Sequence, residues 1–258
     1  MHHFETILVE KSEGFAIITI NAPPVNAVTR QLSDELTLAF DTMSADDEVR
    51  AVVFTARGRI FCAGADLKNR AKNISGPAEL IAHSRRTREV YHAIRECAKP
   101  VVAALNGPAV GAGLVMAACA DILLASEAAF VSLPEVDIGL AGGCRHSMRL
   151  FGHSTLRRMA LTGYRVSARE MYRLGIIEQC TTPDELLPAA LDIARQIASK
   201  SALSTSLGKH TLNVLEELGL RDGYRYEQDM TAVLAKTDDA KEAQLAFVEK
   251  RAPVFQNR

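Results

Sequence analysis

The chain has 258 residues, which is long enough for one large domain or for a domain with an appended region. Its hydrophobic fraction of 48% and charged fraction of 24% are typical of a globular enzyme, and 30 Lys and Arg residues against 31 Asp and Glu residues leave a net charge of −1. This balance gives no indication of a nucleic-acid partner, and no apolar run has the length of a membrane span or the form of a signal peptide, so we expect no membrane partner either.

Two β-rich runs, 5–10 and 15–20, are separated by the turn signal Lys11-Ser12-Glu13-Gly14 and predict a hairpin. Asn21-Ala22-Pro23-Pro24 ends the second strand. A helix over 29–44 follows, because its apolar residues recur at helical spacing and place one stripe on a single face: Leu32, Leu36, Phe40 and Met43.

The next segment alternates again between strand and helix. Val52-Val53-Phe54 predicts a short buried strand, and the loop 57–66 contains the small residues Ala63-Gly64-Ala65. A helix is predicted over 78–97 and ends at Lys99-Pro100. We expect its apolar positions to include Leu80, Ile81, Val90 and Ile94.

Residues 100–125 read as strand, glycine loop, buried helix and strand. The apolar runs 101–105 and 122–125 flank a loop with Gly107, Gly111 and Gly113 and an uncharged helical run, 114–118. The first N–H groups of a helix have no partner within it, so this helix start can bind an anion, or a carbonyl oxygen that gains negative charge during a reaction. A close-packed turn without a ligand explains the pattern equally well.

The remainder of the chain is predominantly helical. Residues 133–140 predict a short helical turn that begins at Pro134 and closes at Gly139. From about residue 154 onward the pattern is almost wholly helical, with long periodic segments over 184–199, 203–218, 223–235 and 239–251. The fold class is therefore α/β, with an α/β core followed by helices.

Several familiar chemistries are excluded by what the motifs lack. Met116 stands where a dinucleotide-binding loop needs its third small residue, and there is no phosphate-binding-loop lysine and no G-x-S-x-G motif. The histidines have no metal-binding spacing, and the five cysteines are scattered without a C-x-x-C pair, so we expect no metal. Reduced thiols in a cytoplasmic compartment are expected.

Two signatures together indicate a family. Phe61–Lys68, with the pattern F-x-A-G-A-D-L-K, resembles the first signature of the crotonase (enoyl-CoA hydratase/isomerase) superfamily, and Asn106–Gly113 resembles the second. Further matches, in the family's order, are Cys119-Ala120-Asp121-Ile122, Pro134–Gly139 and Ala246–Arg251. The resemblance covers essentially the whole chain. It implies a crotonase-like spiral of ββα turns, with an acyl-CoA-binding core at 1–200 and a helical C-terminal oligomerisation region at 201–258 that forms trimers or hexamers.

The same resemblance implies an acyl-CoA thioester as the substrate and no cofactor beyond the coenzyme A that the substrate carries. Its carbonyl oxygen would accept hydrogen bonds from the backbone N–H groups of Ala65 and Ala112. The residues implied along the substrate are Val25, Asn26, Ala27, Ala63, Asp66, Leu67, Lys68, Gly111, Val115 and Leu140. Lys250 is either a contact to a neighbouring subunit's CoA or a surface lysine.

One position departs from the family pattern. Hydratases of the family carry two glutamates, and here the first position is Val115 and the second is Glu135. Valine can neither hold nor deprotonate water, whereas a single carboxylate can move a proton between two carbons. We therefore expect double-bond isomerisation of an enoyl-CoA by Glu135.

Hydration is the alternative reaction, with another polar residue in place of the missing glutamate. The candidates are Asp137, His146, His83 and Arg85. Decarboxylation, thioester hydrolysis and a catalytically silent CoA-binding interaction protein also stay open.

Overall fold

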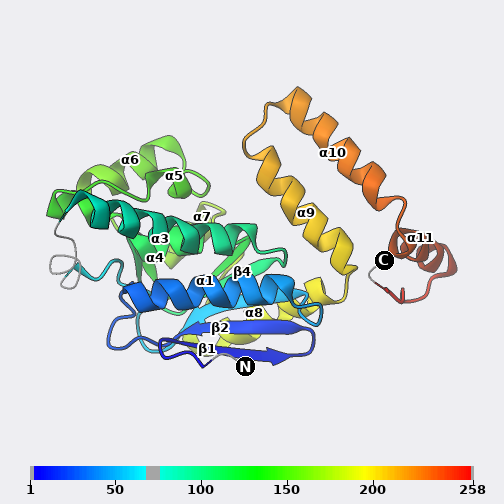
Figure 1. Cartoon of the computed structure of the whole chain (residues 1–258), viewed down its shortest axis with the longest axis horizontal. Coiled ribbons are helices and arrows are strands. Elements are labelled where there is room, and N and C mark those ends of the chain that lie inside the picture. Colours follow the sequence, from blue (N-terminus) through cyan, green and yellow to red (C-terminus); the bar gives the residue numbers. More distant parts are fainter. Residues whose placement is uncertain (1–2, 68–75, 257–258) are drawn as a thin grey trace.

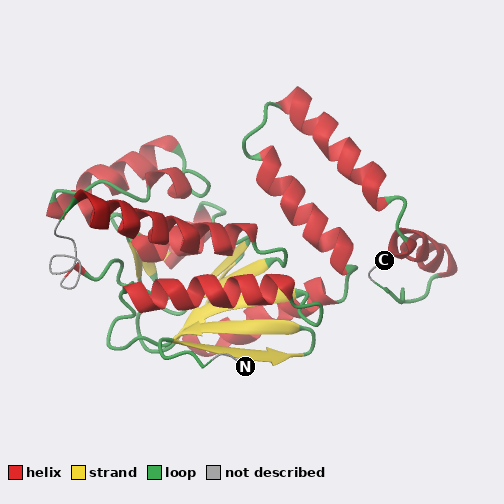
Figure 2. Ribbon diagram, viewed as in Figure 1, coloured by secondary structure: helices red, strands yellow, loops and turns green. Residues whose placement is uncertain are grey.

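The structure, a computed structural model, describes residues 3–67 and 76–256, and its centre is a six-stranded sheet (Figures 1 and 2). The strands lie in the order β1 (Ile7–Ser12), β2 (Phe15–Ile20), β3 (Ala51–Ala56), β4 (Val101–Leu105), β6 (Ile122–Ser126) and β9 (Gln179–Thr181). The pair β1–β2 is the predicted hairpin and is antiparallel, because Glu13 and Gly14 both have positive φ and form a tight turn. The other neighbouring strands are parallel.

Helices cover both faces of this sheet. The predicted helices α1 (Arg30–Ala45) and α3 (Pro77–Glu96) pack on one face, and α8 (Pro183–Ala198) packs on the other. Successive side chains of a strand point to opposite faces, so Val52 and Phe54 join the first apolar cluster while Val53 joins the second. A parallel sheet with both faces covered explains why its strands read as continuous apolar runs.

A smaller sheet lies beside the main one and contains β5 (Ala109–Val110), β7 (Phe130–Ser132) and β8 (Val166–Ser167). The predicted buried helix α4 (Ala112–Ala118) follows β5, and the predicted short turn η1 (Pro134–Ile138) follows β7. The sequence pattern did not predict β8 or β9. Strands of two or three residues carry no readable period, and these two form only by pairing with distant strands.

The remaining helices are α5 (Cys144–Ser147), α6 (His153–Thr162), α7 (Ala168–Arg173), α9 (Ala202–Leu215), α10 (Leu220–Leu234) and α11 (Asp238–Glu249). The helical nature of the C-terminal region is confirmed. Figure 1 shows α9, α10 and α11 extending away from the sheet and the helices that cover it. Among the described residues, no helix is both long and apolar enough to cross a membrane.

A buried ion pair attaches α9 to the core. Lys209 is only 6% exposed, and its Nζ lies 2.8 Å from Oδ2 of Asp121 and donates to the carbonyl oxygen of Lys99 over 3.1 Å. Asp121 precedes β6 and also accepts a hydrogen bond from the N–H of Val101. Removing one partner of such a pair leaves an uncompensated charge, so this contact holds α9 in place.

The four apolar residues expected on α3 all lie in this helix, but they differ in burial. Leu80 and Ile81 are 45% and 68% exposed, whereas Val90 and Ile94 are fully buried. The reason is that Val90 and Ile94, in the C-terminal half of α3, belong to the apolar core, while the N-terminal half lies beyond it. Helical periodicity identifies a stripe but does not show how far along the helix the core extends.

Candidate active site

The site forms where three neighbouring chain segments end: the segment that contains Cys62, strand β5 and strand β7. Cys62 and Ala109 are bridge partners, and the N–H of Val110 donates to the carbonyl oxygen of Cys62 over 2.9 Å. On the other side of β5, the N–H of Gly111 donates to the carbonyl oxygen of Ser132 in β7 over 2.9 Å. Because these pairings are parallel, the residues that follow each segment converge.

Two backbone N–H groups are left without an acceptor at this edge. Around Ala65, the N–H of Val28 donates to Gly64 and the N–H of Asp66 donates to Val28. The N–H of Ala65 therefore points the opposite way, and no described residue accepts it. Ala112 is the first residue of α4, so its N–H has no partner within the helix.

Gly64 keeps these two donors close together. Its φ is +94°, and a Cβ atom at this position would lie 3.0 Å from the carbonyl oxygen of Val110 and 3.8 Å from the backbone nitrogen of Ala112. A side chain would therefore force the two loops apart, and only glycine adopts this conformation without strain.

Glu135 lies in η1, next to the start of α4. A Cβ atom at Gly111 would lie 2.5 Å from Oε1 of Glu135, so the absence of a side chain at Gly111 makes room for the carboxyl group. The other oxygen, Oε2, is buried without a hydrogen-bond partner. Burial raises the pKa of Glu135 above its usual value of 4.5, and a hydrogen bond from its own backbone N–H opposes this shift.

A cavity of about 470 Å³ contains most of the predicted site residues. Those that line it are Ala63, Ala65, Leu67, Gly111, Ala112, Val115, Glu135 and Leu140. Val25, Asn26, Ala27 and Asp66 lie outside its lining, and Lys68 lies outside the described residues.

Asn26 has a structural role that the sequence did not predict. Its side chain accepts a hydrogen bond from the N–H of Ala22 and donates to the carbonyl oxygens of Arg57 and Ile60, and the residue is only 3% exposed. These bonds fix the loop that leads to Ala63. The side chain of Asn26 thus supports the site from behind and has no free polar atom for a substrate.

Another part of the cavity wall comes from two other helices. α3 contributes His83, Thr87, Arg88 and Tyr91, and α5 contributes His146, whereas Arg85 lies in a depression between α1 and α3. Sequence analysis did not single out Tyr91. The signal was present, since residues 83, 87 and 91 are spaced four apart and continue the inward face that carries Val90 and Ile94.

Asp137 and His146 both line the cavity but differ in their surroundings. Asp137 is exposed, and its Oδ2 lies 2.9 Å from the point where a Cβ atom at Gly163 would be, so the carboxylate is directed at the end of α6. The ring of His146 lies 5.2 Å from the ring of Tyr91 between centroids. Burial, and then the positive charge of Arg149, lower the pKa of His146 below 6.5.

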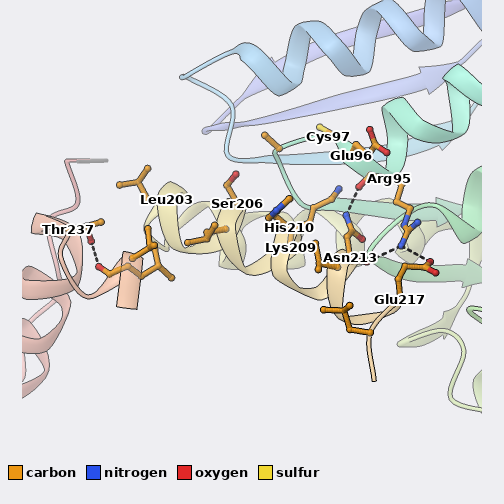
Figure 3. A pocket seen from close by; sticks show the side chains of 16 residues that line it. Arg95, Glu96, Cys97, Leu203, Ser206, Lys209, His210, Asn213, Glu217 and Thr237 are labelled. Carbon is orange, nitrogen blue, oxygen red and sulfur yellow. Dashed lines mark hydrogen bonds and ion pairs between the residues drawn. The ribbon is translucent and has the colours of Figure 1, made fainter. Parts of the chain in front are cut away.

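A second, larger cavity of about 840 Å³ lies between the end of α3, α9 and α10 (Figure 3). Figure 3 shows Arg95 and Asn213 facing each other, and each donates to the other's backbone carbonyl oxygen. The carboxylate of Glu217 is paired with Arg145 over 2.7 Å. None of the predicted site residues lies here. In the described part of the chain, no group of three or more His, Cys, Asp or Glu side chains is placed to hold a metal ion.

The cavity brings together two backbone donors without an acceptor and the half-buried carboxyl group of Glu135, an arrangement that can stabilise negative charge on a bound carbonyl oxygen. The chain belongs to the enoyl-CoA hydratase/isomerase family, whose model matches residues 10–258, and it has the crotonase fold. Enzymes of this family act on acyl-CoA thioesters.

Individual relatives agree with this assignment. The chain is 33% identical, over 99% of its own length and 92% of the relative's, to a Dictyostelium discoideum protein named "Probable enoyl-CoA hydratase, mitochondrial". It is 35% identical, over 92% of its own length and 96% of the relative's, to a Mycobacterium tuberculosis protein named as a methyl-dioxo-hexahydroindene-carboxyl-CoA hydrolase. The crystal structure of an enoyl-CoA hydratase/isomerase from Mycobacterium paratuberculosis matches with a TM-score of 0.88 at 33% identity, and 99% of each chain is covered.

Proposed function

We propose that this protein is an enoyl-CoA isomerase in which Glu135 moves one proton between the α- and γ-carbons of a 3-enoyl thioester. The observation that carries the proposal is the pairing of Glu135 with Val115 in one cavity. Glu135 presents a buried oxygen without a hydrogen-bond partner, while Val115, 2% exposed on α4, offers only methyl groups. This arrangement provides one acid–base carboxyl group and, at the position of the family's other glutamate, no group that can hold water.

The reaction follows from the positions of the donors and the carboxylate. The thioester oxygen accepts hydrogen bonds from the N–H groups of Ala65 and Ala112. The carboxylate of Glu135 takes a proton from the α-carbon, and the electron pair delocalises over the thioester and the adjacent double bond. Glu135 then returns the same proton to the γ-carbon, which leaves a 2-enoyl thioester. Because the negative charge on oxygen exists mainly in the transition state, the two donors lower the barrier rather than merely bind the substrate.

Hydration of a 2-enoyl thioester is the second candidate, supported by the hydratase name of the Dictyostelium relative. It requires a group that holds the attacking water, and Val115 cannot do this. Hydrolysis, the reaction in the name of the mycobacterial relative, would use the same two donors. A silent CoA-binding protein would bind esters without turning them over.

The deciding measurement is the ratio of isomerisation of a 3-enoyl-CoA to hydration of the matching 2-enoyl-CoA. We expect isomerisation to dominate in the unmodified protein. Val115→Glu places a second carboxylate on the same helix whose start carries the Ala112 donor, and it should shift the ratio toward hydration. Val115→Gln is the matched control, because glutamine has the same size as glutamate but transfers no proton. Hydration that exceeds isomerisation in the unmodified protein would reject the isomerase assignment.

The reaction proposed here needs the CoA ester alone, without a metal or a redox cofactor. We further propose that residues 201–258 form a trimerisation region and that the chain assembles into trimers or hexamers. The five cysteines form no disulfide, which supports a reducing compartment, and we propose the cytoplasm.

A further inference from the structure

Two neutral hydrogen-bonding side chains stand together on the part of the cavity wall that α3 and α5 form. Tyr91 comes from α3 and His146 from α5, and their ring planes are tilted by 58° with centroids 5.2 Å apart. The mechanism proposed above uses neither of them. Glu135, its proton acceptor, lies near enough for its charge to act on Tyr91.

Both groups stay uncharged at neutral pH. Burial raises the pKa of Tyr91, and the neighbouring Cys119, Cys62 and Glu135 add to this shift. Burial lowers the pKa of His146, with further contributions from the positive charges of Arg149, His92, Arg95 and Arg145. Among the described residues, no hydrogen bond is formed by the hydroxyl group of Tyr91 or by the ring nitrogens of His146. Each side chain is therefore available both to donate and to accept.

Two opposite charges lie in the cavity near this pair, since Arg88 of α3 lines it and the charge of Glu135 acts on Tyr91. The arginines close to His146 in the sequence are already paired with carboxylates just after the end of α9, since Arg149 is 2.9 Å from Glu216 and Arg145 is 2.7 Å from Glu217. A carboxylate brought to Tyr91 would instead meet the negative field of Glu135. A neutral oxygen avoids this repulsion and still satisfies the two side chains.

The cavity also has apolar lining residues, among them Val115 and Leu140, besides the polar Thr87 and Arg88 of α3. A hydrocarbon chain that ended here would bury the hydroxyl of Tyr91 without a partner, which costs free energy. A substrate with an oxygen atom at this point would avoid that cost.

We propose that Tyr91 and His146 form a subsite for a neutral oxygen substituent, a carbonyl or hydroxyl group, on the acyl chain of the thioester. This inference rests on the proposed function, because it takes an acyl-CoA as the occupant of the cavity. It names the substrate class as oxygenated acyl-CoA esters rather than plain hydrocarbon chains.

Binding of unreactive esters tests the subsite without any turnover. The probes are saturated oxoacyl-CoA esters with the carbonyl at successive positions, together with the hydrocarbon parent of the same length, measured by titration calorimetry. At least one oxo ester should bind about tenfold more tightly than the parent, as expected for a hydrogen bond to an otherwise unpaired group. In Tyr91→Phe and in His146→Gln this preference should fall below about threefold.

Matched controls come from the same residue types outside the cavity. Tyr172→Phe changes an exposed tyrosine of α7, and His153→Gln changes an exposed histidine of α6, and both should keep the preference for the oxo ester. The subsite is rejected if the unmodified protein binds no oxo ester more tightly than the parent, or if Tyr91→Phe leaves the preference intact. A different role for Tyr91 and His146 would appear as a protein with no preference for an oxo ester in which Tyr91→Phe abolishes hydration of a plain 2-enoyl-CoA. The two side chains would then hold water, and the subsite is rejected in that case too. Selective binding of an oxo ester without isomerase turnover would reject the isomerase assignment alone.

Discussion

At the scale of single residues, the environment of Glu135 opposes its own charge. One carboxyl oxygen is buried without a hydrogen-bond partner, and the resulting rise in pKa means that the folded protein binds this proton more tightly than the unfolded chain does. The same burial that costs stability makes the ionised carboxylate a stronger base toward a carbon acid. In the proposed mechanism, stability and catalysis are therefore in conflict at this residue.

Glu135→Gln separates the effect of this carboxyl group on catalysis from its effect on stability. We expect kcat to fall by about 10²–10⁴-fold, because the amide cannot accept the proton, with little change in ester binding. Since the pKa is raised in the folded state, the free energy of unfolding of the unmodified protein falls as pH rises from 4.5 through the folded pKa. Glutamine does not titrate, so the variant should be more stable at pH 7, and this gain should shrink toward pH 4.5.

Urea denaturation at both pH values measures the difference, and Glu178→Gln on the exposed surface is the control, with neither effect expected. A variant that keeps its activity, or whose stability difference grows on acidification, would contradict this account of Glu135.

At the scale of elements, the site depends on where short parallel segments end. The bridge of Cys62 with Ala109 and the pairing of β5 with β7 align three chain exits at one edge. Each exit then supplies one of the groups that the proposed mechanism uses, on Ala65, Ala112 and Glu135. The side chains of two of these residues are single methyl groups, so the functional groups are their backbone N–H donors.

Ala112→Pro removes one donor at the start of α4 and should lower kcat/KM at least 100-fold, about the effect of losing one oxyanion donor. Proline is accepted at the first position of a helix. Gly111, the residue before it, has φ 53° and ψ −115°. These angles mirror the extended region that residues before proline prefer, and glycine adopts the mirrored region freely. Gly111 therefore does not prevent a proline at position 112.

Ala112→Ser keeps the N–H and serves as the control, with a loss of less than about tenfold expected. Circular dichroism verifies the fold of both variants. An Ala112→Pro protein that is folded and fully active would remove Ala112 from the reaction.

The elements that the sequence predicts are those whose start and end depend on the residues at those positions. The start of η1 at Pro134 and its end at Gly139 follow from the fixed φ of proline and the positive φ open to glycine. The role of Asn26 could not be predicted, because its hydrogen-bond acceptors at Arg57 and Ile60 are about thirty residues away in the sequence. Tyr91 was missed for a related reason: helical spacing gives a face, but only the packing of α3 over the cavity shows what that face meets.

At the scale of the whole molecule, the C-terminal helices leave large apolar side chains uncovered. On α10 and α11, Leu220, Phe247 and Val248 are 93%, 85% and 77% exposed, and Leu212 on α9 is 66% exposed. Exposed apolar surface on this scale marks an interaction surface. Figure 1 shows that these helices stand apart from the sheet, so the core of the same chain does not cover them.

Light scattering at micromolar concentration should therefore give the mass of a trimer or of a multiple of it. Leu212→Asp should lower that mass, because association would bury its charge. Leu161→Asp is the matched control, since Leu161 is 67% exposed but lies on α6 at the far side of the molecule. A monomeric mass for the unmodified protein, or equal dissociation by both substitutions, would contradict association through the C-terminal helices.

The use of main-chain donors has a consequence for how this protein tolerates random mutation. Every residue except proline carries a backbone N–H, so most small replacements at Ala65 and Ala112 leave the donors in place. The sensitive positions are instead their neighbours: a Cβ atom at Gly111 would collide with the carboxyl group of Glu135, and one at Gly113 would lie 2.5 Å from the carbonyl oxygen of Cys62. In a saturation library, inactive clones would accumulate at these glycines rather than at the alanines. In the proposed mechanism, the side chains around the thioester can therefore change, and the reaction with them, without altering the groups that bind its oxygen.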